Sequence, residues 1–185
     1  MVYPIVVYGS PVLRRVAGEV DKEDPGLKQF IADLWETMYK SDGVGLAAPQ
    51  VGKSIRIFVI DTAELDKNDP SLQDFKKTFI NPRIINRDGE KWTSNEGCLS
   101  IPKIREDVER QSEIRIQYFD ENWDFHDEAY DGIKARVILH EYDHLEGILF
   151  IDLLSPLRKK LLKGKLKDIT KCNVDVDYKI RVLKN

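Results

Sequence analysis

The stretch His140-Glu141-Tyr142-Asp143-His144 is the strongest single signal in this sequence. In an α-helix, residues four apart lie one turn apart and about 40° around the axis, so the two histidines share a face. Glu141 lies about 100° from His140, with His144 between them, so the three side chains can converge. Two imidazoles beside a carboxylate are what a divalent metal and an activated water require. The pattern predicts a hydrolytic metal site and leaves its third ligand open.

The helix that carries this motif is predicted to run from Gly132 to about Glu146, with Asp131 as its N-cap and Gly147 as its stop. Apolar residues and both histidines share one stripe, which we expect to face inward toward strands. The stripe consists of Ile133, Val137, His140, His144 and Ile148. A lone inward histidine is more often a core residue, but two at this spacing beside a glutamate favour a metal.

Upstream of this helix, apolar spacing predicts one further helix and several strands. Residues 25–40 carry an apolar stripe at helical spacing, which predicts an amphipathic helix that packs on the core. The β-rich segments are Ile55–Asp61, Phe79–Ile85 and Ile104–Phe119, with a return strand after the turn at 120–122. The Asn81-Pro82 pair predicts an edge or a bulge in the second strand.

Three segments are predicted to be loops or turns. Residues 41–52 hold three glycines and a proline, which argues against regular helix or strand. Lys53-Ser54 follows Gly52, but position 47 is alanine where a phosphate-binding loop requires its first glycine, so that reading is disfavoured. Residues 62–77 are polar and are expected to form a surface loop without core residues. Asp88-Gly89 is expected to be a turn.

Composition limits the class of protein. The 185 residues suit one domain, 1–185, and the net charge of −3 argues against nucleic acid as the main partner. Two cysteines are too few for a disulfide framework, which favours a reducing compartment. Residues 1–5 lack the features of a signal peptide, and no apolar run approaches a membrane span. We therefore expect a cytoplasmic protein without a membrane partner.

The C-terminal region divides into two predicted elements. Leu157–Ile169 is predicted to be a basic amphipathic helix, which is most often a solvated face and less often a partner-binding surface. Its cations are Arg158, Lys159, Lys160, Lys163, Lys165 and Lys167. Val174–Val182 is rich in β-branched residues and is expected to form a short terminal strand.

The third metal ligand has three candidates: His126, a carboxylate, or Cys98. Zincin proteases with the same helix motif take their third ligand downstream, but no histidine follows His144 here. Cys98 lies in the segment Glu96–Ser100, where neighbouring glycines would expose the backbone. A buried, inert cysteine is the alternative interpretation of Cys98.

Three separated motifs resemble the peptide deformylase family. Residues 43–50 (GVGLAAPQ) match its GxGxAAxQ motif, residues 96–100 (EGCLS) match its EGCLS motif, and residues 140–147 (HEYDHLEG) match its HExxHLxG motif. Their order and spacing agree, and residues 11–14 (PVLR) extend the likeness toward the start. The resemblance implies an α+β fold with antiparallel sheets around a central HExxH helix, an N-terminal amphipathic helix and a C-terminal basic helix.

The resemblance implies that Cys98, His140 and His144 bind the metal. Glu141 would be the catalytic base that takes a proton from the activated water and later delivers it to the leaving amine. The oxyanion would be bound by the Gln50 side chain and the Leu99 backbone N–H. The implied activity is removal of the N-formyl group from formylmethionine on nascent polypeptides, with release of formate.

The resemblance also implies which residues contact the substrate. They are Val44, Gly45, Arg105, Arg136 and Val137. An ion pair of Arg105 with Asp42 or Glu96 is the competing interpretation of that arginine. Val137 would form apolar wall beside the methionine side chain, and Arg136 would offer its aliphatic stem more than its charge.

The resemblance further implies one Fe(II) ion as the physiological metal, with zinc, nickel or cobalt as substitutes. Leu139 departs from the family's usual glutamine, and we expect it to lie off the metal face without loss of activity. The alternative functions are a zincin-like metalloprotease and a non-catalytic, metal-stabilised peptide-binding module. A contact between the basic C-terminal helix and the ribosome is a further hypothesis.

Overall fold

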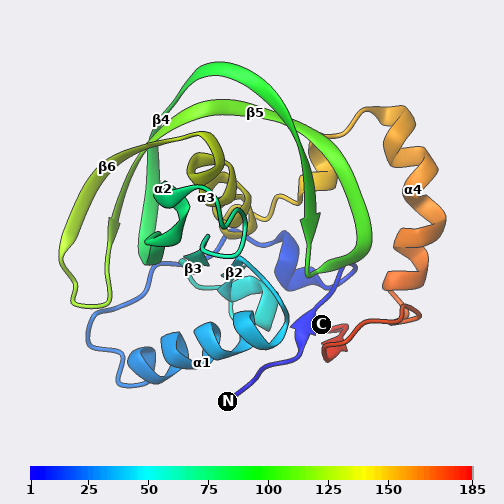
Figure 1. Ribbon diagram of the computed structural model, residues 1–185. Coiled ribbons are helices and arrows are strands. Elements are labelled where there is room, and N and C mark those ends of the chain that lie inside the picture. Colours follow the sequence, from blue (N-terminus) through cyan, green and yellow to red (C-terminus); the bar gives the residue numbers. More distant parts are fainter. Residues whose placement is uncertain (185) are drawn as a thin grey trace.

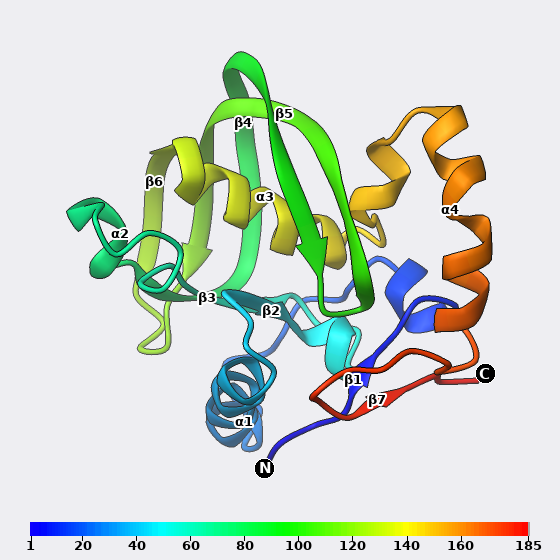
Figure 2. The same cartoon turned by 45° about the vertical axis from the view of Figure 1, so that its right-hand side comes forward.

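The computed structural model describes residues 1–184 and has the mixed helix and antiparallel-sheet fold that the sequence predicted (Figures 1 and 2). The helices are α1 (Leu27–Lys40), α2 (Pro70–Gln73), α3 (Gly132–Leu145) and α4 (Pro156–Ile169), with short 3-10 helices η1 (Pro11–Arg14), η2 (Ala48–Val51) and η3 (Phe150–Leu153). The strands are β1 (Ile5–Val6), β2 (Gly45–Ala47), β3 (Ile57–Asp61), β4 (Lys76–Cys98), β5 (Ile101–Phe119), β6 (Phe125–Asp131) and β7 (Ile180–Arg181).

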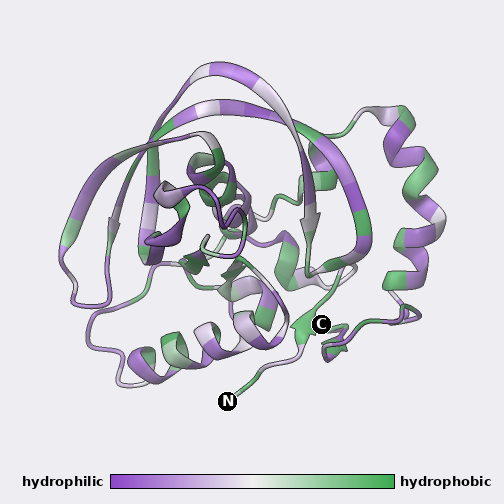
Figure 3. Ribbon diagram, in the orientation of Figure 1, coloured by the Kyte–Doolittle hydropathy of each residue, from purple (hydrophilic) through white to green (hydrophobic). Residues whose placement is uncertain are grey.

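The larger sheet has five antiparallel strands in the order β2-β3-β4-β5-β6. Its long strands β4 and β5 arch over α3, which contacts β2, β3, β5 and β6 (Figures 1 and 2). Strand β5 alternates as predicted, with Ile114, Ile116 and Tyr118 buried toward the core. Figure 3 shows hydrophobic residues at β2 and β3 in the centre and mainly hydrophilic ones on the crest of the arch.

The five-stranded sheet curves around helix α3. The helix follows Asp131, whose side chain makes no capping hydrogen bond, and the chain leaves it at Gly147, whose φ is +71°. The expected inward stripe holds for Val137 and His144, but Ile133 is 40% exposed. Ile133 differs because it lies in the first turn, at the wall of the cleft described below.

Helix α1 packs on the core as predicted, although it begins at Leu27 and not at residue 25. Its apolar stripe joins a core cluster with residues of β2 and β3. The buried members of the stripe are Leu27, Phe30, Ile31, Leu34 and Met38.

The loop prediction for residues 41–52 is wrong in its middle. Gly45–Ala47 form β2, which pairs antiparallel with β3, and Ala48–Val51 form η2. Glycine here does not mark an irregular segment, because Gly45 is the residue that lets this strand approach α3 closely: a Cβ on Gly45 would lie 2.6 Å from Glu141 Oε1.

Two other expectations are also wrong. Residues 62–77 contribute to the core, because Leu72 on α2 and Phe75 are buried, and Phe75 packs against Tyr130 at a ring distance of 5.3 Å. Asp88-Gly89 is not a turn between strands. Strand β4 continues through it, and the β4–β5 register shifts there. The irregularity expected at Asn81-Pro82 is confirmed by the register shift between Ile80 and Arg83.

The C-terminal strand is shorter than predicted and pairs in another way. Only Ile180–Arg181 form β7, which runs parallel to β1, so the smaller sheet is not antiparallel. Longer pairing is limited because β1 itself has two residues. Among residues 1–184, no helix combines the length and the apolar character that crossing a bilayer requires.

Candidate active site

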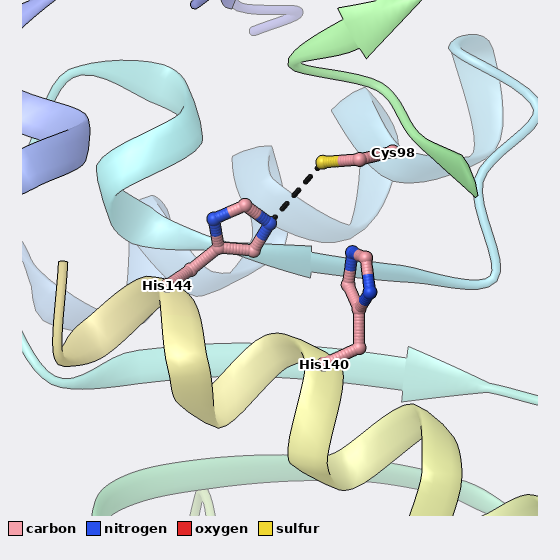
Figure 4. Close-up of side chains that lie close together, drawn as sticks. All are labelled: Cys98, His140 and His144. Atoms are coloured by element: carbon pink, nitrogen blue, oxygen red, sulfur yellow. Dashed lines mark hydrogen bonds between the residues drawn. The ribbon is translucent and has the colours of Figure 1, made fainter. Parts of the chain in front are cut away.

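Three candidate ligand side chains meet between α3 and the end of β4. Cys98 closes β4, while His140 and His144 project from adjacent turns of α3 toward it (Figure 4). Their ligand atoms all lie within 4.8 Å of one another, and Cys98 Sγ lies 3.2 Å from His144 Nε2. Within residues 1–184 this is the only such group of three. His126 is not part of it, because it hydrogen-bonds Asp120 at 3.0 Å and stacks on another part of the sheet.

This group of donors fits a divalent metal ion. One thiol and two imidazoles are ligands that zinc and ferrous iron both accept. His140 Nδ1 is 2.9 Å from Glu96 Oε2, an arrangement that orients the ring and leaves its other nitrogen for a metal. Burial lowers the pKa of His144 well below its usual value, and so does the nearby His140. The neutral ring that results is the form that binds metals.

A buried ionic network surrounds Glu96 and connects the ligand helix to the sheet. Glu96 accepts hydrogen bonds from Arg110 at 2.7 and 3.0 Å and from Arg136 at 2.9 Å. Arg110 also donates to Asp143 on α3 at 2.6 Å. Burial opposes ionisation of Glu96, but hydrogen bonds from His140 and Arg110 hold its pKa well below the usual range. Glu96 is therefore a carboxylate that supports His140.

Glu141 lies beside the ligands without a partner of its own. Its Oε2 is buried and makes no hydrogen bond to any described residue. Burial raises the pKa of Glu141 to about 7. A buried carboxyl group with a pKa near neutrality can both accept and donate a proton, which is what a general base and acid requires.

Gln50 is held with its amide nitrogen toward the ligands. Its Oε1 accepts a hydrogen bond from the Ala47 N–H at 2.8 Å. The side-chain Nε2 then points toward Cys98 Sγ at 3.5 Å and Ser100 Oγ at 3.3 Å. Because the oxygen is used by the backbone, the nitrogen side faces the site, as a donor to an oxyanion must.

A cleft of about 500 Å³ opens beside these groups. It is lined by Cys98, Leu99, His140, Glu141 and Gln50. All of the residues expected to contact the substrate also line it: Val44, Gly45, Arg105, Arg136 and Val137.

Both arginines of the cleft bond residues of the protein, and Arg105 does not form the ion pair that was its competing interpretation. Arg105 bonds the side chain of Asn95 at 2.8 Å and its backbone oxygen at 3.1 Å, and not Asp42 or Glu96. Glu96 is already taken by Arg110 and Arg136. Arg136 is buried and uses its guanidinium for Glu96 and for the backbone oxygen of Val108. Its charge is therefore structural.

Several residues around the site were missed by sequence reasoning. Arg110 and Glu106 alternate with Ile104 and Val108 on the buried face of β5. A charged residue at an inward strand position is a signal of a buried ion pair. Tyr178, which donates a hydrogen bond to the Leu99 carbonyl at 2.9 Å, had no local signal.

Leu139 lies off the ligand face, as expected. It is buried in the core cluster that α3 forms with the sheet. An apolar side chain suits this buried position, and the expected lack of effect on activity stays a prediction.

Comparison with known proteins identifies the family. The family model described as "Polypeptide deformylase" matches residues 2–160. The chain is 54% identical over 188 residues to a peptide deformylase of Christiangramia forsetii, covering 98% of this chain and 96% of that protein. The solved peptide deformylase structures from Legionella pneumophila (TM-score 0.81, 33% identity, 94% of this chain and 98% of that one) and Thermotoga maritima (TM-score 0.76, 44% identity, 84% and 99%) are similar. The chain therefore belongs to the peptide deformylase family.

Proposed function

We propose that this chain is a metal-dependent hydrolase that removes the N-formyl group from formylmethionine at the start of newly made proteins. The observation that carries the proposal is the meeting of Cys98, His140 and His144 within 4.8 Å, beside Glu141 and Gln50. Membership of the peptide deformylase family supports it. We further propose that residues 1–185 act as one catalytic domain.

The proposed role of Cys98, His140 and His144 is to hold one divalent ion. When bound, such an ion supplies a Lewis acid that brings the pKa of water near neutrality. Glu141 Oε2 then takes one proton from the attacking water and passes it to the departing amine nitrogen. The water oxygen bonds to the formyl carbon and the C–N bond breaks, which gives a free α-amine and formic acid; the acid loses its remaining proton to solvent and leaves as formate.

The proposed oxyanion donors are the Gln50 Nε2 and the Leu99 N–H. Both belong to short segments that border the cleft, and the Gln50 amide is oriented by its bond from the Ala47 N–H. Removal of one such donor typically costs about 2.7–4 kcal/mol of barrier. Val44 and Val137 provide apolar surface for the methionine side chain, while Gly45 and Arg105 border the path of the peptide.

We propose Fe(II) as the physiological ion, with zinc, nickel or cobalt as substitutes. The donor set alone accepts each of them, and intrinsic affinity favours zinc over ferrous iron. The measurement is metal analysis of protein purified without oxygen, compared with protein purified in air. Zinc at full occupancy in both preparations, with full activity, would contradict the proposal of iron.

The test of the activity compares two substrates. With Ni(II) or Fe(II) loaded under anaerobic conditions, formyl-Met-Ala-Ser should release formate, while internal bonds of a longer unformylated peptide stay intact. Internal cleavage without formate release would support the zincin-like protease. Metal binding and peptide binding without either product would support the non-catalytic peptide-binding module.

We propose that α4 contacts the ribosome. Leu157 and Leu161 are 66% and 63% exposed and lie one turn apart, in a helix with several exposed lysines. Such cations are attracted to RNA phosphates, and apolar side chains among them favour a specific contact over a diffuse one. Arg158 and Lys159 are less available, because they bond Glu106 and the Asp152 backbone oxygen.

The test of this contact therefore reverses the charge of lysines other than Lys159. The triple variant Lys160→Glu, Lys163→Glu, Lys167→Glu should lose cosedimentation with ribosomes at low salt and keep its deformylation rate. A control with the same change in charge is Lys22→Glu, Lys28→Glu, Lys40→Glu, which are exposed residues outside α4. Equal cosedimentation of both triple variants would contradict the proposal.

A further inference from the structure

The segment that follows α4 returns along the base of the molecule and lies against the N-terminal strand (Figure 2). The Ile5 N–H donates to the Lys179 carbonyl at 2.8 Å, and the Val7 N–H donates to the Arg181 carbonyl at 3.0 Å. Farther along, the Leu183 N–H donates to Ser10 Oγ at 3.0 Å. We call residues 178–183 the tail. Backbone hydrogen bonds hold the tail, so the positions of its side chains are fixed.

One tail side chain reaches the segment that carries the thiol ligand. The Tyr178 hydroxyl donates a hydrogen bond to the Leu99 carbonyl at 2.9 Å, directly after Cys98. The Tyr178 ring also lines the cleft. On the same segment, the next carbonyl, that of Ser100, accepts a hydrogen bond from the Tyr8 N–H at 2.8 Å. Tyr8, just after the N-terminal strand, and the tail thus hold two successive carbonyls.

A second tail side chain reaches the segment that carries Gln50. Arg181 Nη2 donates to the Val51 carbonyl at 3.0 Å. A Cβ on Gly52 would lie 2.9 Å from this guanidinium nitrogen, so glycine leaves the space that the contact occupies. Gly52 also has a φ of +94°, which few other residues adopt. The contact is therefore built into the local backbone.

The two contacts share one consequence. A tyrosine hydroxyl is protonated at neutral pH, so the Tyr178 hydroxyl is a donor to the Leu99 carbonyl. A peptide carbonyl with a fixed partner restricts rotation of its own plane and, through it, of the adjoining backbone. Donors contribute most when they are oriented before charge develops in the transition state.

We propose that Tyr178 and Arg181 are positioning residues that fix the two segments bearing the oxyanion donors, Leu99 and Gln50. The inference rests on the deformylation proposed above. Neither residue is among the candidate ligands, the proposed base or the proposed oxyanion donors. Their loss should therefore weaken an interaction made mainly in the transition state, which lowers kcat and leaves KM nearly unchanged.

The first test is Tyr178→Phe, which removes one oxygen and keeps the ring. We expect kcat for formyl-Met-Ala-Ser to fall about tenfold, less than the ~100–1,000-fold loss that follows outright removal of a donor. KM and metal content should stay within twofold of the native values. Amide hydrogen exchange of the zinc-loaded protein should accelerate in residues 97–101.

Tyr3→Phe is the matched control. Tyr3 packs against the same core cluster as Tyr178, and its hydroxyl bonds Asp33 at 3.3 Å, on α1. This variant should keep the native kcat and the native exchange of residues 97–101. A loss of kcat in both variants would show a general effect of cluster packing and would overturn the proposal.

The second test is Arg181→Met, with Arg181→Lys as the conservative variant. Arg181→Met should lower kcat severalfold and accelerate exchange in residues 48–52, and Arg181→Lys should restore part of both. Native kcat and native exchange in Tyr178→Phe and Arg181→Met would overturn the inference. So would a tenfold rise in KM or a loss of metal in Tyr178→Phe. Absence of formate release by the native protein would instead contradict the proposed function, and hydrogen exchange would still test the positioning.

Discussion

Helices α3 and α4 have the same length of 14 residues and opposite environments. Helix α3 is enclosed by the sheet and buries Arg136, Glu141, Asp143 and His144. Helix α4 buries only a strip of apolar residues, Leu162, Leu166 and Ile169, and its lysines face solvent. The difference shows where ionisable groups acquire chemical roles. Burial makes the charges of Arg136 and Asp143 on α3 depend on partners, whereas most of the lysines on α4 remain available to outside partners.

The buried groups of α3 are not equivalent. Arg136 and Asp143 are neutralised by Glu96 and Arg110, so together these four groups form a balanced network. Glu141 Oε2, Arg136 Nε and His144 Nδ1 are buried without a hydrogen bond to any described residue, and Glu141 is the one carboxyl group among them. An unpaired buried carboxyl group costs stability, and such groups concentrate at functional sites. Substitutions on and around the two helices can separate these roles.

The largest expected effect is at Glu141. Glu141→Gln keeps the size of the side chain and removes its ability to carry a proton, so kcat should fall by about 10²–10⁴-fold. Metal content should remain at the native level, because Glu141 is not among the candidate ligands. Formate release and metal analysis on the same preparation check both points. Activity that survives this change would show that another group is the base.

The next effect concerns the ionic network. Arg110→Met leaves Glu96 and Asp143 without their shared cation, and loss of one partner of a buried ion pair typically costs about 3–5 kcal/mol. Urea denaturation at fixed metal content measures the change. The control on the same strand is Arg115→Met, whose ion pair with Asp127 is exposed to solvent and should matter little. Equal destabilisation by both would contradict the importance of burial.

Gly45→Ala should act on catalysis through displacement of a neighbour. The added Cβ would lie 2.6–2.8 Å from three atoms of the Glu141 side chain, so that carboxyl group must move. Misplacement of a catalytic group by about 1 Å can cost about 100-fold in rate. Steady-state kinetics should show a loss in kcat. A native kcat would mean that β2, and not Glu141, gives way.

The smallest effect is expected at Gly164, the glycine within α4. A Cβ on Gly164 would meet nothing within 4 Å, and Gly164 lies inside the helix. Gly164→Ala should stabilise the protein by about 0.5–1 kcal/mol, because alanine has the higher helix propensity. Thermal unfolding measures this, with kcat unchanged. A loss of stability would contradict this expectation and show that a side chain at position 164 disturbs α4.

The meeting of Cys98, His140 and His144 could be predicted because each lies in a short motif with a family resemblance. His140, Glu141 and His144 occupy one helix, and Cys98 lies in a motif that resembles the family's third ligand. Helix α1 and the alternation in β5 could also be predicted, from short, local patterns. The roles of these residues in catalysis remain predictions, for which the substitutions above are the tests.

Features that depend on distant pairing could not be predicted. Gly45–Ala47 form a strand only because β3 lies beside them, and glycine alone favours a loop. Leu72 and Phe75 are isolated apolar residues in a polar segment, and only the packing of α2 on the sheet shows that they are core. Arg110 lies 14 residues from Glu96 and 33 residues from Asp143, so no spacing rule connects these partners.

The parallel pairing of Ile5–Val6 with Ile180–Arg181 has a consequence for the time at which a new copy of the enzyme becomes complete. During translation the N-terminal segments emerge first, and the ligand helix precedes the tail by several tens of residues. Pairing of β1 with β7 closes a long loop of chain, which carries an entropic cost, and the contacts across that loop form late. A growing chain therefore possesses its ligand residues before the contacts from Tyr178 and Arg181. We expect the finished arrangement only after residue 181 has been made.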